Sequence, residues 1–223
     1  MKAEKRKQAI EMRKNGEAIT IIAKKLHVAK SSVSCWVRDV YLDQMAKDKL
    51  NKSKIRGCKI AARNISETHR IRRLNYQKNG SVAAKKDDLL HAMGCMLYWA
   101  EGQKSRNACS LSNTDPYLLK LFVRFLKQKF AINNNDIAIR LNCYIDNGKT
   151  IKDIENYWIK TLDINGAKIN KHTIKKFVPT ARYRKNKYPY GVCTIVVSRT
   201  ELVQHIYGAI QEYAGFNNNY CLD

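Results

Sequence analysis

Apolar positions near the start of the chain recur at helical spacing and predict two short helices joined by a tight corner. They run through both helices and form one inner face: Ile19, Ile22, Ala23, Leu26, Val28, Val33, Trp36 and Val37. A preceding helix carries Ile10 and Met12 and is expected to stop at Gly16. His27 stands at the corner, where the backbone often turns left-handed, a conformation that His tolerates better than most residues.

Once this inner face is buried, the second short helix exposes a small polar and cationic set: Lys30, Ser31, Ser32, Cys35 and Arg38. Two packed helices of this kind form a helix-turn-helix, which presents its second helix to the major groove of DNA. Small hydroxyl groups approach base edges closely, and cationic side chains neutralise phosphates. We therefore predict that these five residues bind DNA. An ordinary helical corner with a solvated face is the alternative.

The charge of the whole chain favours the same kind of partner. Lys and Arg number 42 against 19 Asp and Glu, which gives a formal net charge of +23 and a pI near 9.8. A polyanion is the expected partner of so basic a protein. The excess lies mainly in residues 1 to 86, which hold 23 basic and 7 acidic side chains. Charge alone does not separate DNA from RNA, so RNA binding is an alternative that the helical corner argues against.

Residues 43 to 86 carry few large apolar side chains and 13 Lys and Arg residues. Such a stretch cannot bury a core of its own, and its like charges repel one another. We therefore predict a basic arm that is either extended or helical only on DNA. Its charges would follow phosphates or a groove, and a solvated tether is an equally good alternative.

An apolar helix opens the next segment. Residues 89 to 100 are apolar nearly all round, which predicts a central, buried helix. Asp87 and Asp88 suit the positive end of this helix, and Gly102 is expected to close it. Glu101 therefore places one carboxylate where a buried helix emerges.

Further helices and strands alternate to about residue 215. Asp115, Thr150 and the pair Ser198 and Glu201 predict the N-termini of three helices, the last through a capping box. Strands are predicted at 108 to 112, 136 to 145, about 168 to 177 and 190 to 197. Within the second of these strands, alternation points a polar and basic set away from the core: Arg140, Asn142 and Tyr144.

The predicted fold class is α+β. An all-α helix-turn-helix domain occupies residues 1–42, a basic linker 43–86, a mixed α/antiparallel-β domain 87–215 and a polar tail 216–223. A basic loop between the last two strands supplies further predicted DNA-binding residues: Arg182, Arg184 and Lys185.

Cysteine usage and apolar content indicate the compartment. The seven cysteines are scattered, and none belongs to a Cys-x-x-Cys pair or a Cys/His cluster, which is typical of a reducing environment. The N-terminus lacks the apolar core of a secretory signal, and no apolar stretch reaches the length of a membrane span. We expect a cytoplasmic, nucleoid-associated protein that does not contact membranes.

The second half resembles one unit of the LAGLIDADG homing endonucleases over roughly residues 87 to 213. The residues that carry the resemblance are Gly94-Cys95-Met96-Leu97-Tyr98-Trp99-Ala100-Glu101-Gly102-Gln103, followed by Ser112-Asn113-Thr114-Asp115-Pro116. In that family two such helices pack side by side, from two protomers or two repeats, and each presents one carboxylate to a divalent metal ion. A helix-turn-helix joined to such a unit is also similar to the WhiA-like bacterial regulators, which keep the scaffold and have lost cleavage.

The resemblance implies a homodimer in which Glu101 of each chain binds Mg²⁺, an ion that prefers carboxylate and water oxygens. Lys104 is near enough in sequence to stabilise developing charge, and Gln103 could orient a water molecule. A structural role for Glu101, such as an ion pair with Arg106, is the alternative.

We therefore expect a sequence-specific protein that binds double-stranded DNA as a homodimer. The enzymatic version is a Mg²⁺-dependent DNA endonuclease that uses Glu101 as the metal ligand. The alternative on the same scaffold is a transcription regulator without cleavage activity, and an RNA-binding protein is a third hypothesis.

Overall fold

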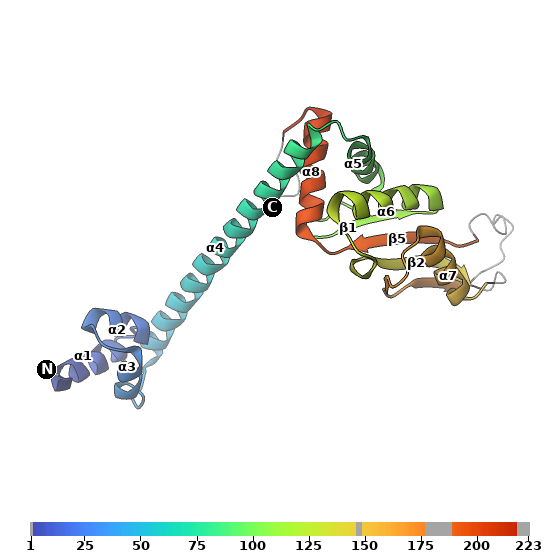
Figure 1. The fold of residues 1–223 in the computed structure, drawn as a ribbon. Coiled ribbons are helices and arrows are strands. Elements are labelled where there is room, and N and C mark those ends of the chain that lie inside the picture. Colours follow the sequence, from blue (N-terminus) through green and yellow to red (C-terminus); the bar gives the residue numbers. More distant parts are fainter. Residues whose placement is uncertain (1, 146–148, 177–188, 218–223) are drawn as a thin grey trace. The chain divides into compact units, whose positions relative to one another are not determined.

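Helices form the first unit of the chain, and a sheet packed against helices forms the second. The computed structural model describes residues 2–145, 149–176 and 189–217, and the chain divides into Met1–Thr68 and His69–Asp223 (Figure 1). Arg182, Arg184, Lys185 and residues 218–223 of the predicted tail lie outside the described residues. In the described part of the chain, no helix is long and apolar enough to cross a membrane.

The first unit contains the predicted helical corner. Its helices are α1 (Lys2–Lys14), α2 (Ile19–Leu26) and α3 (Lys30–Trp36). Their shared core is made of residues from all three helices and the turn after α3: Ala9, Ile22, Ala23, Val33 and Val37. His27 has φ 49° and ψ 55°, so the left-handed corner is confirmed.

The basic arm is a continuous helix, α4 (Gln44–Ala84). Every residue from 51 to 69 is exposed, whereas Arg73, Gln77, Gly80 and Ala84 are buried at intervals of three or four residues. Because these four positions share one face of the helix, its last turns pack into the second unit, where Gly80 meets α8. The arm is therefore helical, and its final part belongs to the core that the sequence analysis began at residue 87.

The second unit follows the predicted order of helices and strands. After α4 come α5 (Leu89–Glu101), β1 (Cys109–Asn113), α6 (Pro116–Phe130), the short 3-10 helix η1 (Asn134–Asp136), β2 (Ala138–Ile145), α7 (Ile151–Leu162), β3 (Lys168–Ile169), β4 (Thr173–Lys176), β5 (Val192–Val197) and α8 (Thr200–Ala214).

The five strands form a mixed sheet in the order β1-β5-β2-β3, and β4 also pairs with β2. β5 is antiparallel to β1 and β2, but β3 and β4 are parallel to β2. The expected antiparallel pairing is therefore confirmed for β1, β5 and β2 and wrong for β3 and β4, because α7 forms a crossover connection that returns the chain parallel to β2.

The predicted strand at 168 to 177 is interrupted by a histidine. Between β3 and β4 the backbone leaves β2, and the Leu141 N–H donates instead to Nδ1 of His172 at 3.0 Å. Nε2 of His172 lies 2.9 Å from Oε1 of Glu155 on α7. A side chain thus satisfies a backbone group that the ladder leaves unpaired, and one expected strand becomes two.

Alternation along β2 separates a helix-covered face from an open face. Ile139, Leu141 and Cys143 are buried in a core shared with α5, α6, α7 and α8, while their neighbours Arg140 and Asn142 are exposed. Figure 1 shows α5, α6 and α8 on one side of the sheet. The face that carries Arg140 points the other way.

Asp88, Asp115 and Thr150 cap the helices that they were predicted to cap. The capping box of Ser198 and Glu201 is wrong, because α8 starts one residue later, with Arg199 as its N-cap and no capping side chain.

The prediction that the helix at 89 to 100 is buried all round is also wrong. Leu89 is 73% exposed, Met93 40% and Trp99 42%. α6 and α8 cover one side of α5, which buries Gly94, Cys95 and Tyr98. The apolar character of the other side therefore has no explanation in the packing of the described residues of this chain.

Candidate nucleic-acid interface

The N-terminal three-helix unit presents most of the predicted DNA-binding residues to solvent. Lys30, Ser31, Cys35 and Arg38 are exposed and Ser32 is half-buried. Val33 is the buried residue through which α3 contacts the core. The opposite side of this short helix is therefore free of packing. A short polar helix held rigidly by its apolar side has the geometry needed to approach base edges.

An ion pair fixes the start of α2 in the same unit. Lys25 Nζ lies 2.8 Å from Oε1 of Glu17, and Arg13 donates to the Glu17 carbonyl oxygen at 3.0 Å. The ion pair with Lys25 neutralises the Glu17 carboxylate near the helical corner. Lys30 on α3 and Arg38 in the turn after it remain as exposed cations.

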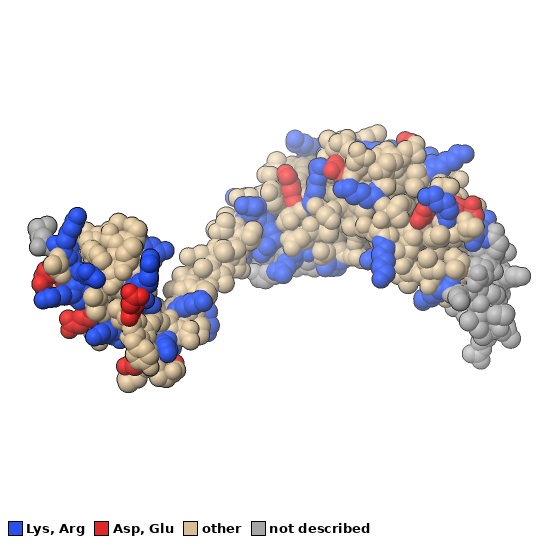
Figure 2. Space-filling model, turned by 90° about the horizontal axis from the view of Figure 1, so that it is seen from below, with Lys and Arg blue, Asp and Glu red and all other residues tan. Residues whose placement is uncertain are grey.

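The open face of the sheet brings together the second predicted set. Arg140, Asn142 and Tyr144 are all exposed on β2. The register places Thr173 beside Asn142, and Lys175 beside Tyr144. Basic side chains are more frequent than acidic ones on the side of the molecule shown in Figure 2.

Hydroxyl groups continue this face across β5 and β1. Arg140 is paired with Thr194, and Thr194 with Ser112. The hydroxyl oxygens of Ser112 and Thr194 are 2.8 Å apart, and Ser110 donates to Oε1 of Gln103 at 2.8 Å. The sequence analysis missed these hydroxyls, although the alternation within β1 and β5 carried the signal. Ser110 and Thr194 are buried and Ser112 is half-buried, so the exposed part of this face lies over β2 and β4.

The predicted catalytic residues gather at the C-terminal end of α5. Glu101 is exposed in the last turn and has no ion-pair partner, Arg106 included, among the residues that the structure describes. Gln103 is held by Ser110 and accepts a hydrogen bond from the Tyr98 hydroxyl through its backbone carbonyl. Gln103 is therefore anchored, while the carboxylate of Glu101 projects into solvent.

Lys104 closes the same helix end. Its ammonium group donates to the backbone carbonyls of Trp99 at 2.7 Å, Gly102 at 2.8 Å and Tyr98 at 3.2 Å. A cation at this position satisfies carbonyl groups that lack a helical partner and stabilises the negative end of the helix. In this structure Lys104 therefore acts as a C-cap, a role for which a lysine just after a helix-ending glycine is a sequence signal.

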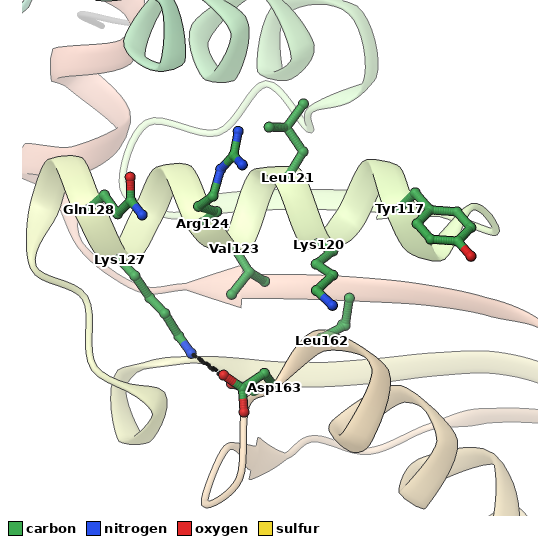
Figure 3. Close-up of a pocket in the computed structure, with 9 residues that line it drawn as sticks. All are labelled: Tyr117, Lys120, Leu121, Val123, Arg124, Lys127, Gln128, Leu162 and Asp163. Carbon is green, nitrogen blue, oxygen red and sulfur yellow. Dashed lines mark hydrogen bonds and ion pairs between the residues drawn. The ribbon is translucent and has the colours of Figure 1, made fainter.

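A groove of about 400 Å³ lies elsewhere in the second unit, along α6 and the end of α7 (Figure 3). Lys127 crosses it and donates to the Asp163 carbonyl oxygen at 2.6 Å. Lys120 and Arg124 extend from the same helix in different directions (Figure 3). None of the predicted catalytic or DNA-binding residues lines this groove.

A pair of buried histidines joins α5 to α8. His91 lies 3.0 Å from His205 through their Nε2 atoms, and its Nδ1 lies 2.8 Å from the Tyr213 hydroxyl. Burial lowers the pKa of His205 to about 4, to which the nearby His91 contributes, and burial also lowers the pKa of His91. Both rings are therefore neutral at pH 7, and one donates to the other.

Comparison with known proteins adds no family assignment. No protein-family model matches the chain, and neither curated proteins nor solved structures give a significant match. The functional argument therefore depends on the residues described above.

Proposed function

We propose that the protein binds double-stranded DNA sequence-specifically through α3 and acts as a homodimer. The observation that carries this proposal is the exposure of Lys30 and Ser31 on a helix whose other side is packed in a three-helix core, with Arg38 exposed in the turn that follows. This combination suits insertion into the major groove, whereas phosphate binding alone needs no such rigid, narrow element. The open sheet face with Arg140 offers a second polar surface for the same duplex.

The test is selection of bound sequences from a random duplex library, followed by affinity measurements. Replacing Lys30 and Arg38 by Ala should weaken binding to the selected sequence about tenfold or more, since a good base contact contributes about 1–3 kcal/mol. The charge-matched control replaces Lys120 and Arg124 on α6 and should change affinity little. Preference of the wild-type protein for RNA, or for no duplex sequence, would contradict the proposal.

The exposed apolar side of α5 supports the homodimer. Leu89, Met93, Met96 and Ala100 follow one another at intervals of three or four residues, so they form a single stripe along the helix, in which Met96 is half-buried and the others are exposed. Exposed contiguous apolar surface of this kind marks interaction sites. A second copy packed on this stripe would bring two α5 ends together, each with its Glu101.

Cleavage of DNA is the second candidate function, and the position of Glu101 favours it. The helix dipole disfavours a carboxylate in the last turn of a helix by about 0.3–1 kcal/mol. The stability of the fold therefore does not explain the presence of Glu101 at this position. One exposed carboxylate from each of two chains fits the oxygen donors that Mg²⁺ takes, with water completing its shell. When bound, Mg²⁺ supplies a water of lowered pKa and stabilises the leaving oxygen.

The chain's own groups would hold this site in place. Lys104 fixes the backbone at the end of α5 and therefore the position from which Glu101 projects. Ser110 holds the Gln103 amide near this helix end. Glu101→Gln should leave folding and DNA binding intact and abolish cleavage of the selected duplex in Mg²⁺. If wild-type protein leaves every selected duplex uncut with each divalent ion tested, the regulator alternative is supported instead.

A further inference from the structure

The middle of α4 is a cationic helix without carboxylates. Residues 49 to 66 contain six Lys and Arg residues and no Asp or Glu. From 51 to 69 every residue is exposed, so this stretch buries nothing against the described residues. Most stability of helices in proteins comes from packing, and this stretch has none.

Four of the cations share one face, which we call the α4 basic stripe: Lys52, Arg56, Lys59 and Arg63. Steps of four, three and four residues keep them within an arc of about 60° around the helix and about 16 Å along it. The opposite face is mostly uncharged and holds Cys58, Ala61, Ala62 and Ile65, although Lys54 also lies there.

The four cations are unpaired. None of them has a hydrogen bond or ion pair with another described residue. Some other cations of the chain are engaged: Lys25 binds Glu17, Lys129 binds Asp88, and Lys104 binds three carbonyls. Like Lys30 and Arg38 in the same unit, the α4 basic stripe has charge available for another molecule.

The stripe also destabilises the helix that bears it. Lys52 with Arg56, and Lys59 with Arg63, are like-charged pairs four residues apart, each unfavourable by about 0.2–0.5 kcal/mol. Gly57 adds about 1 kcal/mol relative to alanine, and a Cβ there would meet nothing within 4 Å. A row of anions along the stripe would remove the repulsion.

We propose that the α4 basic stripe binds successive phosphates of one DNA strand beside the site that α3 contacts. This inference rests on the proposed binding of duplex DNA and assigns α4 the sequence-independent part of the affinity. A helix with cations about every 5.5 Å along one face matches a regular polyanion better than an isolated ligand. α3 supplies the choice of sequence, and the stripe supplies charge neutralisation.

The test compares two variants that remove the same charge. The first replaces Lys52, Arg56, Lys59 and Arg63 by Gln. The control replaces cations on α6 and α7 by Gln: Lys120, Arg124, Lys152 and Lys160. Affinities for the selected duplex and for an unrelated duplex are measured across a range of salt concentrations, and far-UV circular dichroism confirms that both variants fold.

We expect the stripe variant to bind both duplexes about tenfold or more weakly, with an unchanged ratio between them. The slope of log affinity against log salt should become shallower by about 3.6, since each phosphate contact contributes about 0.9. The control should keep a slope close to that of the wild type.

Equal slopes for the stripe variant and the control would overturn the inference while leaving sequence-specific binding through α3 intact. A fall in the ratio between the two duplexes would also overturn it, because the stripe would then contact bases. A larger loss of affinity for RNA than for duplex DNA would assign the stripe to a different partner. If wild-type protein prefers no duplex sequence, the proposed function itself fails.

Discussion

Two glycines determine how closely α4 and α8 approach each other in the second unit. A Cβ on Gly80 would lie 1.9 Å from the His205 carbonyl oxygen, and one on Gly208 would lie 1.9 Å from the Gln77 carbonyl oxygen. The close approach lets the Gln77 side chain reach Gln204 at 2.8 Å and Gln211 at 3.1 Å. A buried polar network of this kind holds one packing arrangement, because a shift would leave amides without partners.

Gly208→Ala should destabilise the second unit by about 3 kcal/mol, because the added methyl group meets backbone that cannot move independently. Urea denaturation followed by circular dichroism measures the change. Gly57→Ala is the matched control, since its Cβ has open space. Equal stability of the Gly208→Ala and wild-type proteins would show that α4 does not pack against α8 as described.

The buried histidines make stability depend on pH. The pKa of His205 is lowered to about 4 in the folded state, so the unfolded state binds more protons below about pH 6.5. Stability is therefore fully present above pH 6.5 and is lost as the pH falls towards 4. We expect a loss of about 1 kcal/mol between pH 7.5 and 5.5, seen as a melting temperature lower by about 2–4 °C.

His205→Gln should reduce this dependence on pH, although it lowers stability at pH 7.5 by removing the hydrogen bond to His91. Carboxylates such as Asp88, whose pKa is lowered by Lys129, contribute at more acidic pH. An unchanged difference between pH 7.5 and 5.5 in the variant would assign the effect to other groups.

At the scale of elements, the sequence predicted best what local residues decide. Asp115 with Pro116 placed the start of α6, and the alternation at 136 to 145 predicted both β2 and its exposed Arg140. Elements that depend on distant partners were harder. The break between β3 and β4 requires His172 to meet Leu141, and the helical state of α4 beyond Arg73 requires α8, more than a hundred residues away.

In the candidate site, too, features set by local residues were easier to predict than features set by three-dimensional contacts. Exposure of Lys30 and Ser31 follows from the periodicity of α2 and α3, so the face could be predicted, although the helix ends before Arg38. The capping role of Lys104 had a sequence signal in its place just after Gly102, but two functions were open to a cation near Glu101 and only geometry distinguishes them.

Gly57→Ala should strengthen α4. The residue is exposed, helical and unpacked, so alanine lowers the free energy of the helix by about 1 kcal/mol. Far-UV circular dichroism should show equal or higher helix content, and hydrogen exchange in residues 51 to 69 should slow about fivefold. Faster exchange would mean that Gly57 permits a bend in the helix, which would contradict a straight helix with evenly spaced cations.

For the whole molecule, the exposed stripe of α5 predicts assembly. Met93→Lys introduces a charge into the proposed contact between two chains, and burial of an unpaired charge is strongly unfavourable. We expect light scattering to show a dimer for wild-type protein and a monomer for this variant. The monomer should still bind one half of the DNA site through α3. Cleavage should be lost, because two Glu101 carboxylates would no longer be brought together.

The matched control is Ile60→Lys, which places the same charge on an exposed apolar residue of α4. It should leave the dimer unchanged. Identical masses for wild-type and Met93→Lys proteins would remove the support that α5 gives to the homodimer.

The exposed middle of α4 also makes the chain sensitive to proteolysis. The six Lys and Arg residues between 49 and 63 lie on an unprotected helix and are preferred cleavage sites of trypsin-like proteases, and local fraying there opens the backbone to cleavage. A single cut between residues 52 and 63 would sever the three-helix head from the sheet-bearing body. Bound nucleic acid would then also protect α4 from proteolysis, so cells would degrade the unbound protein first.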